Sequence, residues 1–203
     1  MKVHTVFTTR NEGDMRKKKM TDAIVAEQVH GNTIAVVSLR DVGKVISNVD
    51  GLVSCDAVRL VVHVADCVPI LAHDIHAHVL GAAHAGWKGT FGNIAKNLIT
   101  SMKALGAEPK NIRVVLGPHI GVCCYDVPRK RAKKFSPNVV RFESGAWYID
   151  LGRANYVQCI EAGVLPTHIS VSDDCTSCQV KRYFSFRKDT KITFGEQMGV
   201  ITV

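Results

Sequence analysis

The chain has 203 residues, with 26 Lys and Arg against 18 Asp and Glu, which gives a formal net charge of +8. This length can bury a hydrophobic core without disulfides, and we predict one domain over residues 1–203. A basic chain suits nucleic acid or an anionic small substrate, but no aromatic residues interleave with the basic runs at 16–19 and 129–134, so nucleic-acid binding is not expected.

Cysteine usage and hydropathy set the expected compartment. There are seven cysteines, and no apolar stretch follows Met1-Lys2-Val3-His4. An odd number of cysteines without a signal peptide predicts neither a disulfide framework nor secretion, and we expect a reducing cytoplasm. The longest apolar runs end within about ten residues, far short of the ~20 that span a bilayer, so no membrane segment is expected.

The first half of the chain reads mainly as strands. Apolar and β-branched runs predict strands at 2–9, 24–29, 33–39, 51–54, 60–64, 68–72 and 79–83. The turn His30-Gly31-Asn32 separates the second strand from the third, and residues 41–50 are expected to form a loop. Several later strands are too continuously apolar to have a solvated face, which places them in the middle of a sheet.

The second half mixes helices and strands. After Gly89-Thr90, apolar residues recur at helical spacing and Gly106 ends the pattern, so one helix is predicted to begin just after His84. Its first amides would favour an anion. Further strands are expected at 112–116, 147–150 and 168–171, a short basic helix after Pro128, a helix at 151–162, and a pairing of 183–186 with 199–203.

A cysteine and two histidines form the main candidate site. Cys67 precedes one predicted strand and His84 follows the next, so thiol and imidazole can converge at neighbouring ends. His30, in its glycine turn, supplies a third donor. Three protein ligands with the fourth position open is the pattern of catalytic zinc. Asp66, beside the thiol, could orient a ligand histidine or relay a proton.

Each of these residues has a plainer interpretation, and other clusters compete with them. A lone cysteine such as Cys67 is often a packed apolar side chain. His63 reads as a hydrogen-bonded core histidine. The Cys175–Cys178 pair has metal-ligand spacing, but Cys123-Cys124 is its only available partner and has the wrong spacing, which favours packed thiols. A weaker metal candidate at a predicted hairpin tip consists of His73, Asp74, His76 and His78.

Six ordered motifs resemble those of one bacterial family. The motifs are Gln28-Val29-His30-Gly31, Asp50-Gly51-Leu52-Val53, Ala65-Asp66-Cys67-Val68-Pro69, His84 to Thr90, Gly117 to Gly121 with Cys124 to Val127, and Cys175-Thr176 with Ser185-Phe186-Arg187. The family is the laccase-domain or polyphenol oxidase family, YfiH-like, also named purine nucleoside phosphorylase and peptidoglycan editing factor. The resemblance runs from Phe7 nearly to the C-terminus.

The resemblance implies a fold and a metal. It implies an α/β layered fold with a mixed sheet flanked by helices, shared distantly with a cysteine-hydrolase toxin domain. It also implies one metal, usually zinc, bound by His30, Cys67 and His84, the same three residues that the spacing selects. Copper is the less favoured metal, because laccase chemistry needs several coppers and more paired histidines than this chain has.

The activity implied by the resemblance is zinc-dependent phosphorolysis of adenosine, inosine or 5'-methylthioadenosine, together with deamination of adenosine. An open zinc site fits, because zinc lowers the pKa of bound water to about 7. Arg10, Lys88 and Arg187 are the candidate phosphate ligands, and Arg10 and Asp66 are candidate catalytic residues beside Cys67 and His84. The alternatives are a cysteine hydrolase with Cys67 as nucleophile and His84 as base, and a factor that edits wall precursors.

The sequence departs from the family pattern at three places. The segment between Arg10 and Gln28 is short, which predicts that part of the pocket wall is missing or rebuilt. Lys88 stands where arginine is usual and loses the bidentate fork. Gly195-Glu196 replaces Gly-Arg, which removes a cation from the region of the site.

Overall fold

Two large mixed sheets contain most of the strands. The computed structural model describes residues 2–203. One sheet has the order β13-β9-β7-β8-β5-β3, with bounds Ile169–Val171, Arg113–Leu116, Val68–Asp74, Val79–Ala85, Gly51–Ser54 and Ile34–Val36. The other has the order β1-β14-β6-β2-β4, with bounds His4–Phe7, Gln197–Thr202, Leu60–Val64, Ile24–Glu27 and Val45–Ser47. Both sheets contain parallel and antiparallel pairs.

The helices and a small third sheet complete the fold. The helices are α1 Trp87–Phe91, α2 Ile94–Ala104, α3 Arg129–Ala132 and α4 Leu151–Glu161. The small sheet has the order β10-β12-β11, with bounds Asp126–Val127, Ala146–Ile149 and Val140–Glu143. Short 3-10 turns at residues 10–12 and 15–17 follow β1. Within residues 2–203, no helix combines the length and apolar character that crossing a membrane requires.

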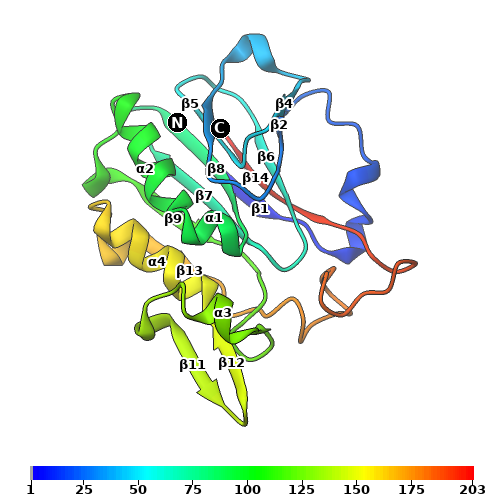
Figure 1. Cartoon of the computed structure of the whole chain (residues 1–203). Coiled ribbons are helices and arrows are strands. Elements are labelled where there is room, and N and C mark those ends of the chain that lie inside the picture. The colour runs from blue at the N-terminus through cyan, green and yellow to red at the C-terminus, as the bar shows by residue number, and fades with distance from the viewer. Residues whose placement is uncertain (1) are drawn as a thin grey trace.

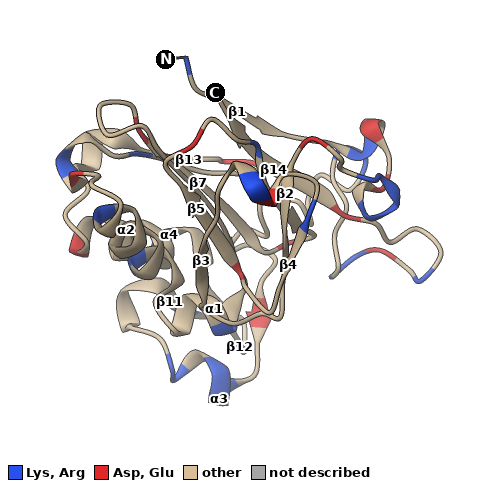
Figure 2. Cartoon of the chain, turned by 90° about the horizontal axis from the view of Figure 1, so that it is seen from above, with Lys and Arg blue, Asp and Glu red and all other residues tan. Residues whose placement is uncertain are grey.

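The molecule is layered around the six-stranded sheet. Helices α2 and α4 cover one face of this sheet, and the five-stranded sheet packs on the other face (Figures 1 and 2). Along β7, Ile70 and Ala72 point into the cluster under the helices, whereas Leu71 points into the cluster between the sheets. All three are fully buried. Successive strand residues face opposite sides, so a strand covered on both sides is continuously apolar, as the sequence predicted.

Most predicted elements are confirmed, including strands β5 and β6 residue for residue. The prediction of a loop at 41–50 is wrong, because this segment contains β4, a short edge strand that pairs in parallel with β2. An edge strand of three residues leaves too short a pattern for recognition. The predicted pairing of 183–186 with 199–203 is also wrong, since β14 pairs with β1 and β6 instead.

The helix predicted after His84 is divided into two. Helix α1 ends at Phe91, and Asn93 has a left-handed backbone with φ of 63° before α2 begins at Ile94. Asparagine adopts this conformation more readily than most residues. The long helix therefore does not start beside His84, and the five-residue α1 is too short for the anion site predicted there.

We predict that the contact between α2 and the sheet sets much of the stability. Leu98 is fully buried and packs over Gly81 of β8. Leu98→Ala should lower the free energy of unfolding by about 2–5 kcal/mol, because a cavity replaces the side chain. Urea unfolding measures this change. Ile192→Ala, at a residue 94% exposed, is the control and should stay within about 0.5 kcal/mol of the parent protein; equal effects at the two positions would contradict the packing described.

Candidate metal centre

Strand register brings the predicted ligands together. In the β7–β8 pair, Pro69 lies opposite His84, so Cys67 meets the end of β8 at Ala85-Gly86. His30 reaches the same point from the turn after β2, and its ring lies 4.8 Å from the His84 ring, edge to face. One donor atom from each of the three residues lies within 4.8 Å of the others. The structure thus gathers the three residues that the sequence selected.

A buried carboxylate orients two of the three predicted ligands. Asp50 has no exposed surface, and its Oδ1 lies 2.9 Å from His84 Nδ1. Its Oδ2 accepts hydrogen bonds from the backbone N–H of Gly31 at 2.6 Å and of Val29 at 3.3 Å. With Nδ1 committed to Asp50, the Nε2 of His84 is the atom left for a metal. The same carboxylate fixes the turn that presents His30.

The backbone around the centre is constrained. His30 has φ of 59° and Asp66 has φ of 81°, left-handed values that cost energy for residues other than glycine. A Cβ on Gly86 would lie 3.2 Å from Cys67 Sγ and 3.2 Å from His30 Cδ2. A Cβ on Gly89 would lie 2.5 Å from the carbonyl oxygen of Gly31. These glycines let α1 approach the ligand turn closely.

The ligands also perturb one another's pKa. Burial alone would raise the pKa of the Cys67 thiol, but the positive charge of His84 and hydrogen bonds with His30 and His84 lower it to about 7. Burial alone would lower the pKa of His84, but the Cys67 thiolate and the bond to Asp50 raise it to about 10. The metal-free pair therefore favours a thiolate beside an imidazolium, and a metal ion would take the place of the proton.

The donor set fits zinc. Tetrahedral zinc with bonds of roughly 2.0 Å to nitrogen and 2.3 Å to sulfur places two nitrogens and one sulfur about 3.3–3.5 Å apart, so small side-chain shifts would close this site. Two imidazoles and one thiolate leave a fourth position open. Blue-copper sites use the same donors with a weak axial methionine, and no methionine lies among the described residues that line the adjoining cavity.

The centre opens into a large cavity. The cavity has a volume of about 1040 Å³, and His30, Cys67 and His84 all line it. Apolar and aromatic walls come from Trp87, Tyr125, Leu151, Phe186 and Phe194, and its cations are Arg16, Arg131 and Arg187. This volume is at the upper end of the range for small-molecule sites. The short segment after Arg10 still contributes a wall residue, Arg16, which pairs with Asp14.

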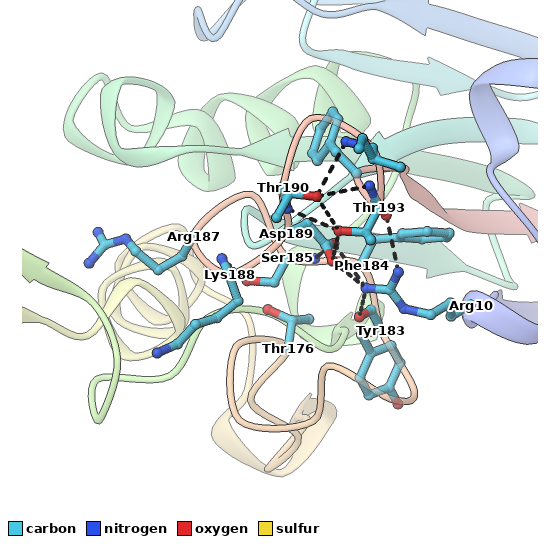
Figure 3. A network of polar contacts seen from close by, with 12 residues as sticks. Arg10, Thr176, Tyr183, Phe184, Ser185, Arg187, Lys188, Asp189, Thr190 and Thr193 are labelled. Atoms are coloured by element: carbon cyan, nitrogen blue, oxygen red, sulfur yellow. Dashed lines mark hydrogen bonds and ion pairs between the residues drawn. The ribbon is translucent and has the colours of Figure 1, made fainter.

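Arg10 does not line this cavity. Its guanidinium donates to both oxygens of Asp189 and to the backbone carbonyls of Tyr183 and Thr193, and it stacks over Phe184 (Figure 3). It contributes instead to a separate cavity of about 550 Å³. Because its charge is already paired with Asp189, Arg10 is poorly placed for the phosphate role that the sequence suggested.

Asp66 is buried, and its carboxylate bonds to the C-terminal third of the chain and not to His30 or His84. It accepts hydrogen bonds from Thr176 Oγ1 at 2.6 Å, Ser185 Oγ at 3.0 Å and the backbone N–H of Arg187 at 2.7 Å. Burial raises its pKa, although these three hydrogen bonds oppose the rise. The carboxylate that orients a predicted ligand histidine is therefore Asp50. Asp66, the residue before Cys67, instead anchors the segment at 176–187.

The remaining cationic side chains differ in whether they line the cavity and in how many of their donors are already bonded. Lys88 is exposed, lies near the Trp87 ring and does not line the large cavity. Arg187 lines it but pairs with Asp126 and donates to the Cys124 carbonyl. Arg131 also lines it, stacks over Trp87 at 4.5 Å and donates to the Tyr125 hydroxyl at 3.4 Å. Its guanidinium has the most donors left for a ligand.

Sequence reasoning missed several residues of the site. Asp50 was visible only as part of a motif, and Arg131 was assigned to a solvated basic run. His63 was expected in the core, but it lines the cavity with its Nδ1 3.6 Å from Glu196. The expectation that Cys175 and Cys178 are merely packed thiols is also revised, because both lie against Cys123 and Cys124. No local pattern predicts contacts between such distant segments.

The weaker histidine candidate is not supported. Asp74 accepts hydrogen bonds from the backbone N–H groups of His76, Ala77 and Glu108, so it closes the β7–β8 turn. The two groups of potential metal ligands found within residues 2–203 do not include this cluster.

Comparison with known proteins gives consistent matches. A family model described as multi-copper polyphenol oxidoreductase laccase matches residues 5–203. The purine nucleoside phosphorylase YlmD of Geobacillus stearothermophilus is 36% identical over 187 residues, which are 84% of this chain and 68% of that protein. The adenosine deaminase RL5 of an unknown prokaryotic organism is 32% identical over 185 residues, which are 83% of this chain and 71% of that protein.

The fold is confirmed by a solved structure. The crystal structure of YlmD from Geobacillus stearothermophilus superimposes with a TM-score of 0.84 and covers 90% of this chain and 74% of the YlmD chain. The layered mixed-sheet architecture predicted from the motifs is therefore correct.

We predict that Asp50→Asn weakens metal binding. The amide loses the charge that holds His84 in the required orientation, and zinc affinity should fall about 10–100-fold. Competition with a coloured zinc chelator measures the affinity. Asp173→Asn, at an exposed carboxylate, is the matched control and should leave the affinity unchanged. Unaltered zinc affinity in Asp50→Asn would show that this carboxylate does not support the centre.

We also predict an unusually acidic thiol in metal-free protein. Because its pKa is lowered, Cys67 should stay thiolate down to pH of about 7, whereas an unperturbed thiol loses its proton near pH 8.5. The rate of alkylation of the Cys67 peptide, followed by mass spectrometry, should fall as the pH drops through about 7, and added zinc should slow it at every pH. A midpoint at the ordinary value would contradict the pairing with His84.

Proposed function

Because the chain belongs to the family described as multi-copper polyphenol oxidoreductase laccase, we propose that it is a zinc-dependent purine nucleoside phosphorylase that also deaminates adenosine. The observation that carries the proposal is the convergence of His30, Cys67 and His84 on the wall of one large cavity. The names of two relatives, a purine nucleoside phosphorylase and an adenosine deaminase, support the substrate class.

The cavity has the chemistry that a nucleoside requires. Trp87, Tyr125 and Phe186 offer flat apolar surfaces on which a purine can stack. Glu27, a polar side chain that lines the same cavity, can hydrogen-bond ring nitrogens or ribose hydroxyls. A few polar groups in a largely apolar pocket orient a small ligand. We take adenosine, inosine and 5'-methylthioadenosine as the candidate substrates.

We assign phosphate binding chiefly to Arg131. Phosphorolysis needs an anion site beside the nucleoside, and arginine binds phosphate through paired donors. Arg131 lines the cavity and is held in place by Trp87, but the only hydrogen bond of its guanidinium within the described chain is to the Tyr125 hydroxyl. Arg187 lies on the same cavity and can contribute a second cation, although Asp126 already shares its charge.

The proposed phosphorolysis exchanges one bond at the ribose. A phosphate oxygen bonds to C1' while the bond from C1' to the purine nitrogen breaks, and the purine takes up a proton. Glu196 lines the cavity, and burial raises its pKa, so this carboxyl holds a proton closer to neutral pH than an ordinary glutamate. We assign the proton transfer to Glu196, because an acid with a pKa nearer the working pH is the better donor.

Deamination would use the same centre. It replaces the exocyclic amine of adenosine with oxygen from water, and ammonia leaves. A zinc ion bound by His30, Cys67 and His84 would supply the Lewis-acid chemistry that activates the water. The His-x-Glu and Pro-Cys-x-x-Cys motifs of nucleic-acid deaminases do not occur in the sequence, so that type of site is not available.

A cysteine hydrolase is the second candidate, and one observation favours it. Cys67 lies against His84, which lies against Asp50, the arrangement of a nucleophile, a base and an orienting acid. His30, however, has no role in such a triad, while it completes a metal shell. Zinc dependence of turnover separates the two mechanisms, because the triad would work in metal-free protein.

We predict phosphate-dependent release of purine base. Zinc-loaded protein should convert inosine to hypoxanthine and ribose 1-phosphate only when phosphate is present, and it should form inosine from adenosine with or without phosphate. Chromatography of the products measures both reactions. Cys67→Ser should lower both rates at least about 100-fold together with the zinc content. Base release that ignores phosphate would refute phosphorolysis, and full activity without metal would favour the triad.

Arginine variants test the phosphate site within the same assay. Arg131→Gln should raise the KM for phosphate about tenfold or more, with unchanged zinc content, because a charge-assisted contact is lost. Arg129→Gln lies on the same short helix at an exposed position and serves as the matched control. Equal KM values for the two variants would remove Arg131 from the site.

A further inference from the structure

Four cysteines from two distant loops meet at one point. Cys123 and Cys124 lie in the turn before β10, and Cys175 and Cys178 lie in a turn that follows β13. The Sγ atom of Cys178 is 3.6 Å from that of Cys123 and 3.3 Å from that of Cys124, and the Sγ atoms of Cys123 and Cys124 are 3.8 Å apart. All four sulfur atoms lie within 4.8 Å of one another.

The backbone builds this cluster. The backbone N–H of Cys124 donates to the carbonyl of Gly121, which curls one loop, and the N–H of Cys178 donates to the carbonyl of Cys175, which curls the other. A parallel bridge between His119 and Cys175 holds the two loops side by side. Four thiols packed against one another bury little apolar surface where Cys123 and Cys178 are exposed, so packing alone does not account for the arrangement.

We propose that Cys123, Cys124, Cys175 and Cys178 bind a structural zinc ion, separate from the centre at His30, Cys67 and His84. Tetrahedral zinc with four bonds of about 2.3 Å to sulfur places the sulfur atoms about 3.8 Å apart, within the range of separations found here. Four thiolates with no open position are the donor set of structural zinc.

The surroundings suit a metal–thiolate centre. The backbone N–H of Gly121 donates to Cys175 Sγ at 3.2 Å, the type of outer contact that orients a metal ligand. A Cβ on Gly121 would lie 3.2 Å from Cys123 Sγ and 3.5 Å from Cys175 Sγ, so a residue without a side chain lets the loop close around the sulfurs. Arg187 donates to the Cys124 carbonyl and places a positive charge beside a centre that carries a net charge of −2.

The position of the cluster gives the ion a structural task. The residue after Cys124 is Tyr125, which lines the large cavity, and the residue after Cys175 is Thr176, which donates to Asp66 next to Cys67. A zinc ion here would join the loop that carries Tyr125 to the loop whose Thr176 holds Asp66. The inference does not depend on the identity of the substrate, since it rests on the cysteines alone.

Metal stoichiometry tests the proposal. The full chain, without a histidine tag, is purified in reductant, supplied with zinc, passed through zinc-free buffer and analysed by native mass spectrometry and elemental analysis. The parent protein should retain two zinc ions per chain. Cys178→Ser and Cys67→Ser should each retain one, and the double variant none. Cys55→Ser, at an exposed cysteine outside both groups, is the matched control and should retain two.

Spectroscopy of the parent protein tests the donor set without any variant. Cobalt in place of zinc should give intense sulfur-to-metal absorption, because five thiolates are engaged at the two sites, four of them at the cluster. Cys178→Ser should lose the cobalt ion at the cluster and with it most of this absorption. Cys67→Ser should lose the other cobalt ion and keep most of the absorption. The two single variants should also differ in stability: Cys178→Ser, which loses the structural ion, should have a lower melting temperature than Cys67→Ser.

Several outcomes would overturn the proposal. One zinc ion in the parent protein, bound by the histidine centre, would do so, as would two ions in Cys178→Ser. Iron at the cluster, recognised by its visible colour and by elemental analysis, would also overturn it, because the bound metal would then not be zinc. A mass 2 Da lower for a cluster peptide in protein kept under reductant would show a disulfide instead of a metal site. Failure of Cys178→Ser to fold leaves the cobalt spectrum of the parent protein to decide.

Discussion

The hydrogen bond between Asp50 and His84 is the contact on which the candidate site depends. Asp50 is fully buried, and its two oxygens serve different elements: Oδ1 contacts the His84 ring and Oδ2 accepts the N–H of Gly31. An unpaired buried carboxylate would be costly, so these contacts must form together. The pairing of β5 with β8 places Asp50 beside His84, and a slip by one residue would turn the imidazole to the other face of the sheet.

A second buried carboxylate connects the centre to the C-terminal third of the chain. Asp66 is bound by Thr176, Ser185 and the backbone of Arg187, three groups more than a hundred residues away in sequence. Arg10 belongs to this support, because Asp189 accepts from both Arg10 and the backbone N–H of Ser185. Hydrogen bonds from the C-terminal segment, which Arg10 of the N-terminal segment supports, therefore hold Asp66 in place beside Cys67.

The two groups of potential metal ligands differ in character: one lines a cavity, and the other consists of four cysteines. A zinc ion bound by His30, Cys67 and His84 would keep one coordination position open, whereas an ion bound by the four cysteines would have none. Thr176, the residue after Cys175, reaches Asp66, so the two groups are linked through one hydrogen bond. Hydrogen bonds between segments distant in sequence therefore support the candidate centre.

The sequence by itself determined the strands with buried faces, the family and the three converging residues His30, Cys67 and His84, because hydrophobic period and the order of motifs can be read along the chain. It could not determine the break at Asn93, the edge strand β4 or the partner of β14, since these depend on competition between segments. Only the tertiary structure decided that Asp50 orients His84, that Arg10 is paired away from the cavity, and that four cysteines meet. Each of these facts is a contact between distant residues, and such contacts are fixed by strand register and loop packing, which no local pattern encodes.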